Sequence, residues 1–196
     1  MRTRVGHMSI RTPNNEQERL KFVRELRLLD TEPEPVFNEL AQLAANVCAT
    51  PAAMISLVDQ HRVFLKARHG VSVSEIDRET AFCSEAICTP DRLFEISDAS
   101  LIEPFSQSRL VVEPPYVRFY AGFPVVTQDG FAIGTLCVAS SEPKCLLAWQ
   151  KDALRVLAHQ VANQIDLRLV LRKHIEYENA LERYRQELEE TVKKLM

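Results

Sequence analysis

The chain has 196 residues, of which 46% are hydrophobic and 26% charged, with only 5 glycines and 10 prolines. This composition excludes a collagen, a wholly disordered chain and a disulfide scaffold, and the length predicts one domain, at roughly 100–200 residues per domain, with room for an appendage. The net charge of −3 gives no long-range attraction for nucleic acid or for an anionic membrane surface, so we expect neither as a partner.

The first part of the chain predicts a loose end and two helices. Residues 1–13 are polar and unpatterned, and we expect them to be disordered. Asn15 and Glu18 fit a capping box, and apolar residues at helical spacing continue to about Leu29. After a proline-rich break, the apolar positions of 37–47 trace one face of a second helix.

Two hairpins follow in the pattern of apolar residues. Segment 53–58 is a short apolar run, and 62–68 alternates between apolar and polar residues, which predicts a half-buried strand paired with the first. Segments 117–126 and 131–139 flank Asp129-Gly130, which supplies the positive backbone dihedrals of a tight turn. Both alternating sets of 131–139 are apolar, so we expect this strand in the middle of a sheet.

The region between the hairpins reads as a short helix at 80–88, a short strand at 93–96 and an irregular crossing at 101–115. Long ordered crossings of this kind more often cap a binding site than merely connect elements. From residue 147 onward there is no proline and no glycine, which predicts one continuous helix to residue 196.

This last helix carries two apolar stripes. Leu154, Leu157, Val161 and Ile165 form one face, as expected for packing on a sheet. A seven-residue repeat then begins and predicts a parallel homodimeric coiled coil over 167–196, with His174 as a polar register residue. Its seam consists of Leu167, His174, Leu181, Leu188 and Leu195 at one heptad position and Val170, Tyr177, Tyr184 and Thr191 at the other.

The five cysteines are an odd number in a chain without a secretion signal, which argues for reduced thiols. No Cys-x-x-Cys pair occurs, which argues against a metal site. No run approaches the roughly 18 apolar residues that a membrane span requires, and the first residues lack the apolar core of a secretory signal. We therefore expect a cytoplasmic protein.

Taken as a set, five motifs of the chain resemble the GAF domain family, in the form found in front of bacterial histidine kinases and diguanylate cyclases. They are 28–34 (LLDTEPE), 55–59 (ISLVD), 81–87 (AFCSEAI), 118–124 (RFYAGFP) and 133–138 (IGTLCV). The resemblance implies an α+β, GAF/PAS-like fold: a central antiparallel sheet of about six strands, the first and last helices on one face and a small-molecule pocket on the other. We expect a GAF domain at 14–166 and a signalling coiled coil at 167–196.

The pocket walls of the family fall on a mixed set of apolar and polar positions of this chain. Core filling is the alternative for the uncharged members, and a salt bridge between loop and sheet is the alternative for the charged ones. The predicted ligand-binding residues are Phe82, Cys83, Ile96, Asp98, Phe105, Arg109, Arg118, Phe119, Tyr120, Thr135 and Cys137.

The resemblance implies a non-enzymatic sensor that binds a small cytosolic ligand and signals through a dimeric helix to a kinase or cyclase output domain. No cysteine is followed by histidine, so the bilin attachment pair is missing, as is the cyclic-nucleotide signature of phosphodiesterase GAF domains. The sequence leaves the ligand or cofactor open and contains no recognisable catalytic set. Two alternatives remain: a dimerisation module with a self-filled pocket, and a thiol-based redox sensor or reductase that uses Cys83 or Cys137.

Overall fold

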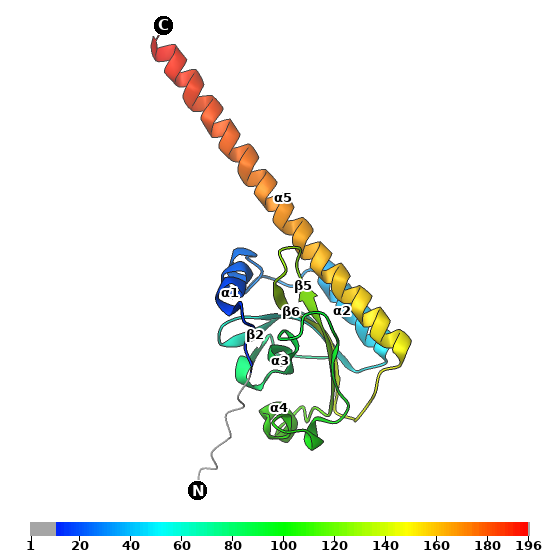
Figure 1. Cartoon of the computed structure of the whole chain (residues 1–196). Coiled ribbons are helices and arrows are strands. Elements are labelled where there is room, and N and C mark those ends of the chain that lie inside the picture. Colours follow the sequence, from blue (N-terminus) through cyan, green and yellow to red (C-terminus); the bar gives the residue numbers. More distant parts are fainter. Residues whose placement is uncertain (1–10, 196) are drawn as a thin grey trace.

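The structure, a computed structural model, describes residues 11–195 (Figure 1). Of the segment 1–13, only residues 11–13 fall within this range, and Arg11 there forms an ion pair with Glu85. The main elements are α1 (Glu16–Glu25), α2 (Pro35–Cys48), β1 (Ala52–Val58), β2 (Arg62–His69), β3 (Glu75–Asp77), α3 (Phe82–Ala86), β4 (Phe94–Ile96), α4 (Arg109–Val112), β5 (Phe119–Val126), β6 (Ala132–Ser140) and α5 (Ala148–Leu195). Short 3-10 turns lie at Arg78–Thr80, Ala99–Leu101 and Phe105–Gln107.

The centre of the fold is a six-stranded sheet of order β3-β2-β1-β6-β5-β4, in which all neighbouring strands are antiparallel. This confirms the predicted α+β class, with β6 in the interior of the sheet as its two apolar faces indicated. The sequence pattern missed β3, because its three residues are too few to show an alternation.

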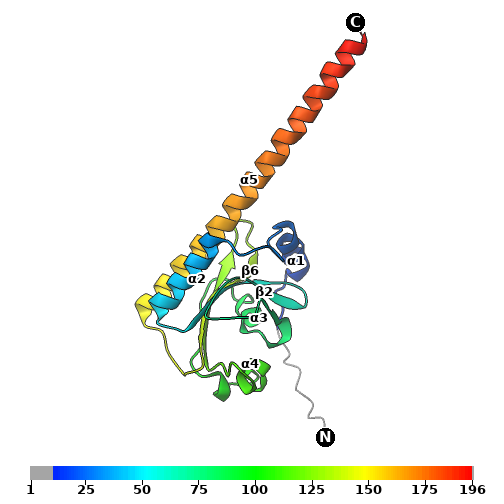
Figure 2. The ribbon, with the colours of Figure 1, turned by 180° about the vertical axis from the view of Figure 1, so that it is seen from behind.

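The two faces of the sheet are covered differently. Buried residues of α1, α2 and α5 join one apolar core with one face, and α2 and α5 lie side by side in both views (Figures 1 and 2). The other face carries α3, α4 and the long crossing. The predicted half-burial of β2 is wrong, since residues 63–67 are all buried. Lys66 is paired under this cover, with Nζ 2.6 Å from Thr31 Oγ1 and 2.7 Å from the Glu34 carboxylate.

The first helix differs from its prediction at both ends. Asn15 makes no side-chain cap, so the expected capping box with Glu18 does not form. The helix ends at Glu25 rather than near Leu29, because Arg27 takes a φ of 53°, in the left-handed region that a right-handed helix cannot include.

The predicted hairpin between β5 and β6 is confirmed, with a correction to its turn. Among the described residues only Gly130 of the Asp129-Gly130 pair has positive φ, at 82°. The Thr127 N–H donates to Phe131 O over 3.1 Å and the Gly130 N–H donates to Thr127 O over 2.9 Å. The loop is therefore longer than a two-residue turn.

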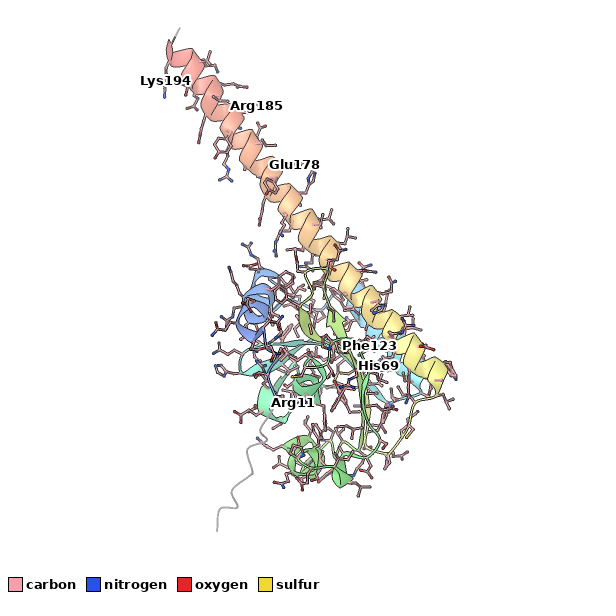
Figure 3. The ribbon with its side chains drawn as sticks, viewed as in Figure 1. Arg11, His69, Phe123, Glu178, Arg185 and Lys194 are labelled. Atoms are coloured by element: carbon pink, nitrogen blue, oxygen red, sulfur yellow. The ribbon has the colours of Figure 1, made fainter. Side chains whose placement is uncertain are left out.

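Helix α5 continues without a break through 48 residues. Leu154, Val161 and Ile165 are buried against the sheet as predicted, and Leu169 is the last buried residue along the helix, since none from 170 to 194 is buried. In Figure 3, Glu178, Arg185 and Lys194 lie on the part that extends beyond the body. No described helix is long and apolar enough to span a membrane.

Candidate functional site

A cavity of about 560 Å³ lies on the sheet face opposite α2 and α5. The sheet supplies its floor through Met54, Leu65, Tyr120 and Ala139, while α3, α4 and the segment after β2 form its walls. Apolar side chains predominate. The lining residues are Pro51, Ala52, Met54, Leu65, Gly70, Val71, Ser72, Val73, Glu75, Ile76, Ala81, Phe82, Cys83, Leu110, Pro114, Pro115, Val117, Tyr120, Ala139, Ser140 and Ser141.

A chain of buried polar groups lies at the floor of this cavity. The Tyr120 hydroxyl donates to Cys83 Sγ over 3.3 Å and lies 3.3 Å from Thr135 Oγ1. Thr135 Oγ1 is in turn 2.9 Å from Ser56 Oγ, and the Cys137 thiol donates to the Met54 carbonyl over 3.6 Å. Buried polar groups in such a chain hold one another in fixed orientations, so the floor is a preorganised polar patch in an apolar cavity.

The pKa values of the two thiols in this patch shift in opposite directions. The neighbouring Cys137 thiol lowers the pKa of Cys83 against the effect of burial, and the hydroxyls of Ser56, Thr135 and Tyr120 lower it further. The interaction with Cys83, together with burial, raises the pKa of Cys137. Burial and the two sulfurs also raise the pKa of Tyr120, which therefore stays a neutral donor. If either thiol ionises, the Cys83 thiol does so first.

The cavity wall carries almost no charge. Glu75 is the one charged residue among those that line it, and its carboxylate is already paired with Arg62 at 2.6 Å. No arginine or lysine of residues 11–195 lines the cavity, so none of these residues neutralises a phosphate or carboxylate of a ligand there.

The structure brings together part of the predicted ligand-binding set. Phe82, Cys83 and Tyr120 line the cavity, and Thr135 and Cys137 are buried beneath it. The remaining apolar residues of that face form a second layer: Phe105 packs on Phe82 with ring centroids 5.3 Å apart, and Ile96 is buried in the same core without lining the cavity.

Phe119 lies on the opposite face of the sheet. It is fully buried in the core beneath α2 and α5, because successive residues of a strand point to opposite faces and its neighbour Tyr120 faces the cavity. Its predicted place in the ligand pocket is therefore wrong, because the strand residue that faces the cavity is the next one along the chain.

The three predicted charged ligand residues are used within the fold. Asp98 accepts hydrogen bonds from the Ser100 N–H and hydroxyl, and Arg109 pairs with Glu113 at 3.0 Å. Arg118 donates to backbone carbonyls, the nearest being Val111 O at 3.0 Å. Arg118 thereby ties the crossing to the start of β5, whereas Asp98 and Arg109 pair locally within the crossing, and none of the three lines the cavity.

Several cavity residues were absent from the sequence prediction. Met54 and Leu65 share the floor, Gly70–Val73 and Leu110 form the wall, and Ser56 is bonded to Thr135 beneath the floor. Of these, Ser56 carried a readable signal, because it is the one polar side chain inside an otherwise apolar run. The loop residues carried none, since their place depends on how the chain returns over the sheet.

A second hollow, of about 580 Å³, lies between α1 and α5. Lys21, Arg24, Arg27, Arg172 and Lys173 line it together with Glu25 and Glu176. It is open to solvent, and exposed long side chains form its rim, so it offers no preorganised group comparable to the buried patch. Within the described residues, no group of three or more His, Cys, Asp or Glu side chains could hold a metal ion.

Comparison with known proteins gives one family for this arrangement. Residues 32–169 match the model of the GAF domain. Over 142 residues the chain is 36% identical to the cyclic di-GMP phosphodiesterase PA2567 of Pseudomonas aeruginosa, a match that covers 72% of this chain and 24% of that protein. The chain thus spans about a quarter of that relative's length.

Solved structures with low sequence identity share the fold. The GAF domain of an Acinetobacter phosphoenolpyruvate-protein phosphotransferase has a TM-score of 0.57 at 17% identity, covering 84% of this chain and 98% of that one. A sensor histidine kinase domain from Sinorhizobium meliloti 1021 gives 0.54 at 15%, covering 74% and 95%. A free methionine-R-sulfoxide reductase from Thermoplasma acidophilum gives 0.54 at 16%, covering 75% and 94%. The fold therefore occurs in both regulatory domains and enzymes, so a function has to be argued from the residues of the site.

Proposed function

Because the chain belongs to the GAF domain family, we propose that it is a non-enzymatic sensor whose cavity binds a small ligand and whose α5 helix transmits the binding to an output domain. The observation that carries the proposal is the position of the cavity. It lies on one face of the sheet while α5 packs on the other, so an occupant of the cavity does not touch α5 and must act through the body of the domain.

We infer an uncharged and largely apolar ligand. The cavity wall is mostly aliphatic and aromatic, its polar groups gather at the floor, and its one charged residue is an already paired glutamate. An anionic ligand such as a cyclic dinucleotide would lose its hydration without gaining a cation. Cyclic di-GMP, the compound in the name of the relative from P. aeruginosa, therefore fits this cavity poorly.

Contacts below α3 connect the cavity wall to α1. The Ser84 hydroxyl on α3 donates to Arg78 O over 2.9 Å. The Arg78 guanidinium donates to Glu16 Oε1 over 2.6 Å and to Asp59 O over 2.8 Å, and Arg19, fully buried, donates to Glu16 Oε2 over 2.7 Å. Within the described part of the chain, Asp59 Oδ1 and Arg78 Nη2 are buried without a hydrogen-bond partner. A cluster with unused donors and acceptors has room for a second arrangement.

The far end of α1 is held by α5. Arg172 donates to Leu26 O over 2.9 Å and to Glu25 O over 2.6 Å, at the point where α5 leaves the body. Arg168, one turn earlier, pairs with Glu34 in the linker that follows. A movement of α3 on ligand binding would therefore reach α5 through α1, provided that the ligand binds one arrangement better than the other.

We propose that α5 pairs with the α5 of a second copy. Leu181, Tyr184 and Leu188 are 66–68% exposed on a part of the helix that no other described residue covers. An isolated helix gains no stability from such a stripe, whereas a parallel coiled coil buries it. The domain would comprise 14–166 and the coiled coil 167–196, and the free thiols fit a cytoplasmic location.

The proposal is tested by thermal melting with 2-phenyl-2-propanol, an uncharged aromatic alcohol, and separately with cyclic di-GMP. We expect the alcohol to raise the melting temperature, because a ligand of the native state stabilises it by mass action, and cyclic di-GMP to leave it unchanged. Ala139→Phe, which fills the cavity floor, should abolish the shift, whereas Ala148→Phe on the exposed start of α5 should retain it.

Signalling is tested by the distance between spin labels at Gln186 of the two copies, a position away from the predicted seam. We expect the distance distribution to change when the alcohol binds, and Arg172→Gln to suppress that change while ligand binding persists. Equal distances with and without ligand would contradict the transmission, and a monomer in native mass spectra would contradict the coiled coil.

A further inference from the structure

We propose that Cys83 is a reactive thiol that reduces an uncharged organic hydroperoxide entering the cavity, with Cys137 closing a disulfide behind it. This inference rests on the proposed function, since it assigns a ligand class to the same cavity.

Access to Cys83 is through the cavity. The residue is only 5% exposed, yet it lines the cavity wall at the start of α3. The other cysteines differ: Cys48 is fully buried in the core beneath the helices, and Cys145 is exposed on the surface. Cys83 is therefore in reach of a molecule in the cavity. A ligand with an apolar body and one polar end would place its polar end at the floor, where the polar groups lie.

The groups around Cys83 stabilise its thiolate and can form a hydrogen bond to the leaving alkoxide. The Tyr120 hydroxyl donates to Cys83 Sγ over 3.3 Å and itself lies 3.3 Å from Thr135 Oγ1. Hydrogen bonds to the ionised form lower a thiol pKa, and the thiolate is the nucleophile. Cys48, by contrast, is buried among apolar side chains, which raise its pKa to about 11.

The reaction balances in two steps. The Cys83 thiolate attacks the outer peroxide oxygen, an S–O bond forms, the O–O bond breaks, and the departing alkoxide takes up the proton that the thiol gave, so that sulfenic acid and alcohol result. The Cys137 thiol then attacks the Cys83 sulfur, the S–O bond breaks, and water leaves as the disulfide forms. In sum, two thiols and one hydroperoxide give one disulfide, one alcohol and one water.

The position of Cys137 suits the second step. Cys83 and Cys137 are both buried in the apolar cluster on the cavity face of the sheet. Of the two, only Cys83 lines the cavity. A peroxide in the cavity therefore meets Cys83 first, and the Cys137 thiol approaches the oxidised sulfur from beneath.

The test is peptide mapping of the whole chain after exposure to cumene hydroperoxide, which reports the oxidation state of each cysteine separately. We expect Cys83 to be oxidised at least about tenfold faster than Cys48 and a Cys83–Cys137 peptide to appear. Cys137→Ser should stop at a sulfenic acid that dimedone traps, and Cys83→Ser should leave Cys137 reduced. Cys48→Ser is the matched control and should react like the unaltered chain.

Two outcomes overturn the proposal: oxidation of Cys83 no faster than that of Cys48, or an equal rate in Ala139→Phe, which fills the cavity. The mapping of the unaltered chain decides this even where a cysteine variant fails to fold. The alcohol 2-phenyl-2-propanol carries the same ring without the peroxide. If this alcohol shifts the melting temperature while cumene hydroperoxide leaves Cys83 reduced, the sensor proposal stands and the thiol chemistry falls.

Discussion

The two faces of the sheet perform different tasks, although the same strands form both. The face beneath α1, α2 and α5 is a continuous apolar core, with Phe37, Phe119 and Leu136 almost completely buried. The other face encloses about 560 Å³ and carries hydroxyls and thiols at its floor. The comparison shows that strand alternation separates the close-packed core from the cavity: neighbouring residues of one strand belong to different faces.

The largest effect should come from breaking the helix-covered face. We expect Phe119→Ala to cost about 3–5 kcal/mol, because its side chain is completely buried and leaves a void that packed neighbours cannot fill. Leu110→Ala on the cavity wall, where the side chain is only partly buried, should cost roughly 1 kcal/mol. Urea unfolding measures both, and equal costs would contradict the division between the faces.

The next effect should come from the buried ion cluster that joins the faces. We expect Arg19→Met to cost about 3 kcal/mol, because it leaves Val58 O and part of the Glu16 carboxylate buried without a donor. Lys21→Met, on an exposed position of the same helix, is the control and should change stability by less than about 0.5 kcal/mol. Guanidinium unfolding of the two variants gives the comparison.

The same cluster should make stability depend on pH. Burial alone would raise the pKa of Glu16, but the hydrogen bonds from Arg19 and Arg78 outweigh it and lower the pKa. Because the folded value lies below the unfolded one, this stabilisation is present above about pH 4.3 and is lost as the pH falls through the folded value. Glu16→Gln should be less stable at neutral pH and show a flatter decline in acid, as measured by chemical unfolding at a series of pH values.

A smaller and more local effect is expected at Gly122. A Cβ there would lie 2.3 Å from the Tyr120 hydroxyl, and the ring end can move because it is the tip of a side chain. We expect Gly122→Ala to cost about 1–2 kcal/mol and to remove the donor from Cys83. Titration of the Cys83 thiol by alkylation rate should then show a raised pKa, and an unchanged pKa would mean that Tyr120 does not control this thiol.

The smallest effect should be found on the far part of α5. His174 lies at a predicted seam position, with Nε2 3.3 Å from a Glu178 oxygen. His174→Leu should strengthen the dimer by roughly 1 kcal/mol, because a polar seam residue fixes register at a cost in stability. Sedimentation equilibrium measures this, with Gln186→Leu outside the seam as control. A dimer weakened by the leucine would contradict the assigned heptad.

The sequence predicted the elements better than it predicted the site. Periodicity and turn residues located the long helix and both hairpins, since each depends on neighbours along the chain, whereas the six-stranded antiparallel sheet was implied by the resemblance to the GAF family. The placement of Phe119 failed because a shift of one residue exchanges the faces of a strand. Asp98 and Arg118 were expected to meet a ligand, but their partners, Ser100 and the carbonyls of the crossing, depend on a loop path that no local pattern encodes.

Helix α5 also fixes a direction. Its 48 residues form a rod of about 72 Å, and each residue added to it turns everything beyond by about 100°. A domain joined after α5 would therefore inherit an angular setting as well as a distance. Inserting seven residues would keep that setting nearly unchanged, whereas inserting two would turn such a domain by about 200°, to the opposite side of the rod.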